Sequence, residues 1–186
     1  MVRSGRLSIL AFVFLMASVV ATTRSPASAA TGAEISRDAS AALSALYRSQ
    51  PAAKALGQRA KGILVFPHML KAGFMFGGQI GEGALFKNGK TVGYYNSVAA
   101  SYGLQAGAQK FGYALFFMND AALKQLDATK GFELGVGPSI VVVDSGVAKS
   151  MTTNTATSDV YAFIFSQKGL MAGLGIQGSK ITKISK

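Results

Sequence analysis

The ionisable residues of this 186-residue chain offer few of the combinations that enzymes use. His68 is the single histidine, and the chain has no cysteine. The carboxylates are scattered and form no short motif such as H-E-x-x-H, so we expect no metal site and no thiol chemistry. A hydrolase would need a carboxylate pair assembled by the fold, for which Glu82 and Glu133 are the candidates. We expect no enzyme and no cofactor, with His68 as a surface or packing residue.

Glycine-rich stretches could also do chemistry, because backbone amides at a helix start can hold a phosphate. Residues 71–83, K-A-G-F-M-F-G-G-Q-I-G-E-G, are followed by a pattern typical of a strand and a hairpin. Residues 173–178 match G-x-G-x-x-G, but the tail at 179–186 is too short for the rest of a dinucleotide site. We therefore expect the glycines to relieve crowding where strands bend or where backbones and rings approach closely.

Basic residues are the strongest binding candidates. The chain has 19 Lys and Arg against 8 Asp and Glu, a net charge of +11. No acidic residue lies between Asp38 and Glu82. Such a surface favours anionic partners, above all phospholipid headgroups, although a solvated helix face is the alternative. Four of the basic residues in this interval, clustered in sequence around the expected helix-to-strand junction, are the predicted lipid-binding residues: Lys54, Arg59, Lys61 and Lys71.

The N-terminal residues have the pattern of an export signal. Arg3 and Arg6 precede an apolar run at 7–21, and residues 27–29 fit an A-x-A cleavage site. We expect a secretory signal peptide at 1–29 and a single domain at 30–186, with a buried N-terminal helix as the alternative. Without cysteine there is no disulfide and no acylated anchor. The expected location is periplasmic or extracellular, peripheral to a membrane, which argues against nucleic acid as the partner.

The remaining pattern predicts an α+β fold. Residues 34–48 and 51–60 have helical spacing, and a short strand at 63–67 should close at Pro67. From residue 73 onward the period is close to two, with Asn88-Gly89 as a two-residue turn and a turn or bulge near Lys110. N-terminal helices should pack on a strongly curved antiparallel sheet or partial barrel.

Three further features are expected in the C-terminal half. Asn119-Asp120 should cap a short inserted helix. Residues 167–169 should form a hairpin turn. Residues 180–185, K-I-T-K-I-S, should form a last edge strand protected by its lysines.

The order of these motifs resembles the SYLF domain, a lipid-binding domain of endocytic and secreted bacterial proteins. The similarity lies in "AKGILVFPHMLKAGFMFGGQIGEGALF" at 60–86 and "YGLQAGAQKFGYALFFMND" at 102–120. It continues in "FELGVGPS" at 132–139 and "YAFIFSQKGLMAGLGIQGS" at 161–179.

The resemblance implies phospholipid binding, with phosphoinositides as eukaryotic ligands and actin binding in some fungal members. In eukaryotic members the N-terminal helical part contacts the membrane. Our hypothesis is a non-enzymatic peripheral phospholipid-binding module of the bacterial cell envelope, with Phe74 and Phe76 as candidate shallow anchors. The alternatives are a protein-interaction or structural module and the hydrolase.

Overall fold

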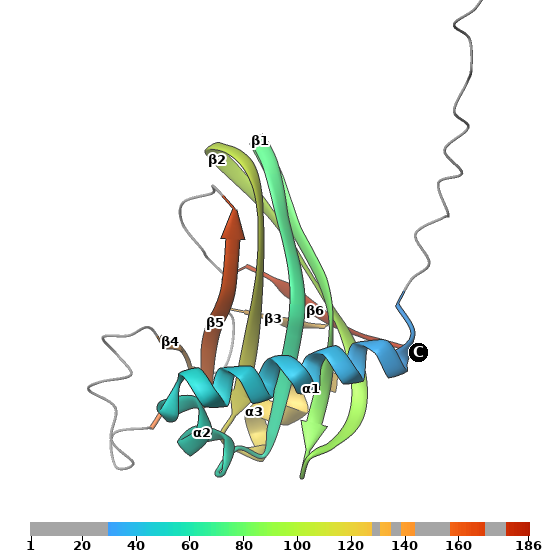
Figure 1. Ribbon diagram of the computed structural model, residues 1–186, viewed down its shortest axis with the longest axis vertical. Coiled ribbons are helices and arrows are strands. Elements are labelled where there is room, and N and C mark those ends of the chain that lie inside the picture. Colours follow the sequence, from blue (N-terminus) through green and yellow to red (C-terminus); the bar gives the residue numbers. More distant parts are fainter. Residues whose placement is uncertain (1–29, 128–130, 135–138, 144–156, 170–177) are drawn as a thin grey trace, which may run out of the picture.

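The computed structural model describes residues 30–127, 131–134, 139–143, 157–169 and 178–186 (Figure 1). The predicted signal peptide and nearly all of the glycine motif at 173–178 lie outside these residues. No helix of the described part is long and apolar enough to span a membrane. The elements are α1 (Gly32–Ser49), α2 (Pro51–Gly57), β1 (Gly62–Lys87), β2 (Lys90–Phe117), α3 (Asp120–Lys124), η1 (Gln125–Asp127), β3 (Phe132–Glu133), β4 (Ile140–Val143), β5 (Val160–Gly169) and β6 (Lys180–Ile184).

The helices confirm the predicted helical segments. α1 begins at a capping box in which the Thr31 hydroxyl accepts from the Glu34 amide and the Glu34 carboxylate accepts from the Thr31 amide. α2 carries Pro51 in its first turn, where the missing N–H is harmless. It ends at Gly57, before the predicted end at residue 60. Asn119 caps α3 through its side chain, as expected.

One curved sheet, centred on β2, holds the described strands together. β1 pairs with β2 along one edge, while β5 and β6 pair with different parts of its other edge. The sheet is antiparallel except for β4, which runs parallel to β5, so the expectation of a purely antiparallel sheet is wrong there. β6 lies between β2 and β3 and is therefore not the predicted edge strand. The α+β class and the strong curvature are confirmed.

β1 and β2 form one long ribbon that folds back on itself. Asn88 and Gly89 make its turn with positive φ angles of 51° and 74°, as predicted. Further along, the Tyr113 hydroxyl donates to Ser97 Oγ at 2.6 Å, which joins the two halves of β2. Figure 1 shows the ribbon bending over at the end far from α2. We call this bend, residues 73–80 of β1 with residues 98–107 of β2, the ribbon tip.

The glycines of β1 allow this folding back. A Cβ added at Gly81 would lie 2.7 Å from the main-chain oxygen of His68. One added at Gly83 would collide with the main-chain oxygen of Val65 and the ring of Phe66. Real Cβ atoms do not approach backbone this closely, so the two halves of β1 touch only because side chains are missing. The predicted role of the glycines in close approach is confirmed.

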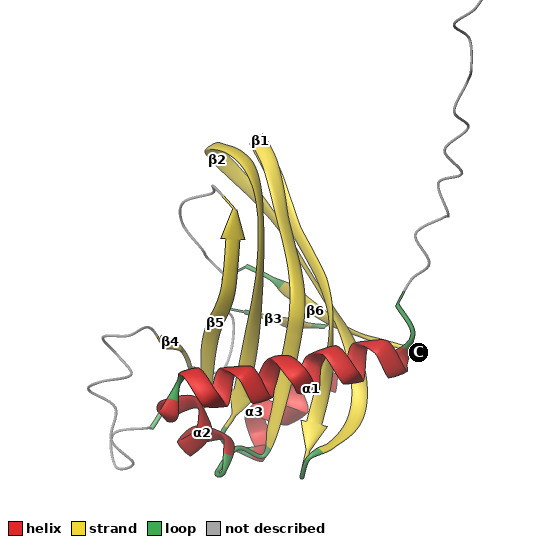
Figure 2. Ribbon diagram, in the orientation of Figure 1, coloured by secondary structure: helices red, strands yellow, loops and turns green. Residues whose placement is uncertain are grey.

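Side chains from the folded ribbon enter two cores, one on each face. Ile63 and Val65 face the layer formed by α1 and α2. Leu64 and Phe66 face the interior of the curl, together with residues of α3 and η1. Figure 2 shows α1 crossing the strands on one side, with α3 behind them. Burial on both faces explains why this segment is continuously apolar rather than alternating.

Replacing Gly83 with Ala should destabilise the protein by about 1–3 kcal/mol, because the new methyl group overpacks against fixed backbone. Gly78→Ala is the matched control, since its Cβ would lie 3.5 Å from the nearest atom, the oxygen of Ala99, an ordinary contact. Urea unfolding followed by circular dichroism measures both variants. Equal stability of the two would contradict the folded-back ribbon.

Acid should weaken the junction of α3 with β4. The Asp159 carboxylate accepts from the Ser139 amide and hydroxyl and from the Asn119 amide group. These hydrogen bonds, the Ser139 amide first, lower the pKa of Asp159 in the folded protein. The ionised carboxylate therefore stabilises the folded protein at pH values above its pKa in the unfolded chain, about 4. This stabilisation is lost as the pH falls through the lower pKa that Asp159 has in the folded protein.

Asp159→Asn should therefore lower Tm more at pH 7 than at pH 3. The new side-chain NH2 group would replace an accepting oxygen and face the hydrogen-bond donors of Ser139 or Asn119. Asp120→Asn is the control, since Asp120 accepts no such hydrogen bonds within the described residues. Thermal scans at both pH values are the measurement. A larger loss at pH 3 than at pH 7 would show that the carboxylate is not the stabilising form.

Candidate functional site

Two β-bulges flank Gly112 in the central strand. β1 carries one extra residue between Phe66 and Met69, opposite Gly112 of β2. β5 carries one extra residue on the other side of Gly112, between Phe165 and Lys168. Bulges bend strands and redirect side chains, and they are common next to functional sites. The predicted irregularity near Lys110 is thus confirmed, and the hairpin turn predicted at 167–169 is wrong because β5 continues to Gly169.

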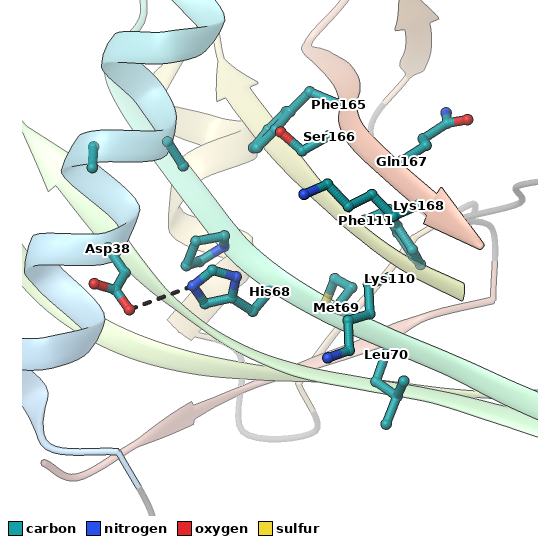
Figure 3. Close-up of a pocket in the computed structure, with 13 residues that line it drawn as sticks. Asp38, His68, Met69, Leu70, Lys110, Phe111, Phe165, Ser166, Gln167 and Lys168 are labelled. Atoms are coloured by element: carbon teal, nitrogen blue, oxygen red, sulfur yellow. Dashed lines mark ion pairs between the residues drawn. The ribbon is translucent and has the colours of Figure 1, made fainter. Parts of the chain in front are cut away.

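An open cleft of about 660 Å³ lies where the two bulges face α1 (Figure 3). Its walls include the apolar side chains of Leu70, Phe111 and Phe165. Lys110 and Lys168 also line it. On the side of α1, the cleft is lined by Asp38 of α1 and His68 of β1. The remaining lining residues are Ala41, Ala42, Pro67, Met69, Ser166 and Gln167.

Gly112 makes room for one wall of the cleft. A Cβ at Gly112 would collide with the ring of Phe165. The ring therefore lies over the central strand, where it is partly buried against the core beneath α1. Ser166, the next residue, has a φ of 54°, a left-handed conformation that is uncommon for a residue with a side chain. This local geometry lets β5 turn from packing Phe165 to presenting Lys168.

Lys110 and Lys168 are directly opposite each other on neighbouring antiparallel strands. Both are exposed, and neither side chain forms an ion pair or hydrogen bond with another described residue. Like charges at opposed positions destabilise a sheet. Two unneutralised cations beside apolar walls therefore form a surface suited to the anionic head of an amphiphilic molecule.

Asp38 and His68 join α1 to the bulge of β1. His68 Nε2 lies 3.4 Å from Asp38 Oδ2, and the histidine side chain is 78% exposed. Arg37 also donates to Asp38 at 2.9 Å. The Arg37 hydrogen bond, assisted by His68, lowers the pKa of Asp38, so this carboxylate stays ionised near neutral pH. His68 is thus the surface residue that the sequence predicted.

The cleft does not assemble a nucleophile and base. His68 on β1 and Ser166 on β5 belong to strands separated by β2, about 10 Å apart at ordinary strand spacing. No hydrogen bond connects these two side chains within the described residues. No group of three or more metal-binding side chains occurs among the described residues either.

The predicted carboxylate pair does not form. Glu82 on β1 is separated from Glu133 on β3 by β2 and β6, about 14 Å along the sheet. Glu82 instead forms an ion pair with Lys186 at 2.9 Å. The hydrolase hypothesis built on Glu82 and Glu133 is therefore wrong in its geometry.

The four predicted lipid-binding residues do not form one exposed group. Lys54 on α2 and Arg59 and Lys61 in the following turn are exposed near one another in the chain. Lys71 is only 5% exposed and faces the interior of the curl. The bulge after Phe66 is the reason, because one extra residue moves every later side chain to the opposite face. The binding role of these residues stays a prediction.

Sequence reasoning missed Lys110 and Lys168 as a pair. The sequence predicts only an irregularity near Lys110 and a turn that contains Lys168. Their register depends on the bulge in β5. The only sign of this bulge in the sequence is the polar S-Q-K at 166–168, which interrupts an apolar run. Only the pairing of β2 with β5 brings the two lysines together.

The fold is a folded β-ribbon packed against helices, with an open cleft beside α1. The comparison with protein families matches residues 98–186 to the model described as Ysc84, Las17-binding protein actin regulator. This match confirms the SYLF-domain resemblance over those residues, which include both lysines of the cleft and Gly112. The comparison with curated proteins found no match.

Lys168→Glu should stabilise the protein by about 0.5 kcal/mol, because it turns the repulsion with Lys110 into a cross-strand ion pair. Lys90→Glu is the matched control, since Lys90 opposes Lys87 in the same way beside the hairpin turn. Urea unfolding at low salt measures both. A destabilised Lys168→Glu variant would show that Lys168 serves the fold rather than a ligand.

Proposed function

We propose that this protein is a non-enzymatic, peripheral module that binds anionic phospholipids. The observation that carries the proposal is the opposed pair Lys110 and Lys168 at an apolar-walled cleft. The family resemblance supports a binding role. Without residues 1–29 the chain keeps 16 of its 19 basic residues and all 8 acidic ones, and this net charge of +8 favours anionic surfaces.

Each part of a phospholipid has a matching part of the cleft. A headgroup phosphate between Lys110 and Lys168 would neutralise two cations that otherwise repel each other. The glycerol and upper acyl segments would lie against Leu70 and Phe165. Basic residues at an anionic membrane contribute about 1 kcal/mol each, weakened by salt, so the attachment is reversible.

Vesicle co-sedimentation tests the proposal. The protein without residues 1–29 should bind vesicles containing 30% phosphatidylglycerol, bind pure phosphatidylcholine much less, and lose binding at high salt. Lys110→Glu with Lys168→Glu should reduce the affinity at least tenfold. Lys87→Glu with Lys90→Glu is the matched control, because it makes the same charge change in a cross-strand pair outside the cleft.

A third variant separates the cleft from the surface predicted by the sequence. It carries Lys54→Glu, Arg59→Glu and Lys61→Glu, all on α2 or the turn after it. The proposal expects this variant to bind nearly as well as the hairpin-turn control. A loss of vesicle binding in this variant alone would show that the binding surface lies at α2. Equal binding of the parent protein to anionic and neutral vesicles would contradict the proposal as a whole.

The remaining parts of the proposal concern the whole chain. We propose export with cleavage of residues 1–29, a single domain at 30–186, and a periplasmic or extracellular location at the membrane surface. Mass spectrometry of the protein from a periplasmic fraction checks the first point. An N-terminus upstream of residue 29 would contradict it.

A protein partner is the second candidate function. It is favoured by the description of the matched family, which names binding to Las17 and regulation of actin. A partner that stays bound at high salt and tolerates Lys110→Glu with Lys168→Glu would favour this function over lipid binding.

A further inference from the structure

We propose that the ribbon tip is a shallow membrane anchor that places Phe76 among the acyl chains of a bilayer. The inference rests on the proposed function, because it assumes that a membrane is the partner. It adds an insertion site that lies beyond the cationic cleft and that carries no charge of its own.

Exposed apolar side chains concentrate on this end of the ribbon. Phe76 is 78% exposed, far more than a phenylalanine in a folded core. The side chain of Phe74 lies outside the described part. Of the six large apolar residues that the described part exposes, four lie on the tip or just below it: Leu70 43%, Phe76 78%, Ile80 55% and Val98 44%.

The distribution of charge matches a bilayer rather than a protein surface. Residues 72–81 and 98–109 contain no Asp, Glu, Lys, Arg or His. Lys110 and Lys168 stand about 10 Å below the tip, three residue steps from the Gly73–Gly107 pair. Lys180, exposed on β6, pairs with Val98 on the other half of the ribbon. An uncharged end with exposed lysines at its base complements acyl chains beneath anionic headgroups.

The backbone at the tip limits the anchor to a shallow depth. Peptide groups in a membrane must be hydrogen-bonded within the protein. β1 pairs with β2 on both sides of an irregularity at Met75, with Phe74 opposite Ala106 and Phe76 opposite Tyr102. Between Val98 and Gln109, β2 pairs with no described strand other than β1. The backbone therefore stays at the hydrated headgroup level, while the Phe76 ring reaches the upper acyl segments. Gln79, the polar side chain nearest Phe76 in β1, is turned inward and donates to Ser179 Oγ at 2.6 Å.

The orientation of the molecule follows from these positions. The ribbon tip and α2 lie at opposite ends of the long axis in Figure 1. A flat membrane that receives Phe76 therefore cannot also contact Lys54 on α2. The cleft lysines, at the base of the tip, remain within reach of headgroups.

A tryptophan at the tip provides the direct test, because the chain contains no tryptophan. Phe76→Trp places a single indole at a site that is already exposed and aromatic. The tryptophan emission should shift to the blue by about 10 nm or more when phosphatidylglycerol vesicles are added, because the indole leaves water. Lipids brominated near the headgroup end of the acyl chains should quench this emission, because the insertion is shallow. Val92→Trp is the control, since Val92 is 50% exposed near the Asn88-Gly89 turn of the same ribbon.

Phe76→Ser completes the test and should weaken vesicle binding about tenfold. If Phe76→Trp binds vesicles without a blue shift or quenching, the anchor is wrong while the proposed function stands. If no variant binds vesicles, both fail. A dimer that sedimentation shows in the parent protein and not in Phe76→Ser would overturn the anchor in favour of a contact between copies.

Discussion

The structure depends on a close approach of two halves of a single strand. β1 doubles back so that Gly81 and Gly83 lie against the backbone of residues 65–69. No side chain could occupy those positions without pushing the halves apart. The folded ribbon then encloses its own apolar residues, and the Tyr113 to Ser97 hydrogen bond closes the interior at 2.6 Å. Burial inside the curl raises the pKa of Tyr113 well above its ordinary value, so this hydroxyl remains a donor.

The same ribbon also carries the proposed binding surfaces. Its base is covered on both faces, by α1 and α2 on one side and by α3 and η1 on the other. Beside α1, bulges in β1 and β5 leave an open cleft around Gly112. A protein with this plan is stable through its base, and its tip is free to carry exposed residues such as Phe76. The proposed binding surfaces and the covered base of the ribbon are thus separated along one axis.

Sequence reasoning predicted the local features well. The Asn88-Gly89 turn, the Asn119 cap and the α1 helix all follow from short-range chemistry that the sequence displays directly. It failed where one extra residue decides the outcome. The bulge at Pro67 keeps β1 continuous through a proline and turns Lys71 inward, because a strand has a period of two and one insertion reverses its faces. The opposition of Lys110 and Lys168 depends on a second such insertion, in β5.

A titration of isotope-labelled protein with a short-chain anionic phospholipid, below its micelle concentration, tests the central claim most directly. Amide chemical shifts locate the ligand without requiring a bilayer. The account predicts that the largest changes surround Gly112, at Lys110, Phe165 and Lys168. Changes confined to α2 and the turn at Arg59 and Lys61 would contradict it.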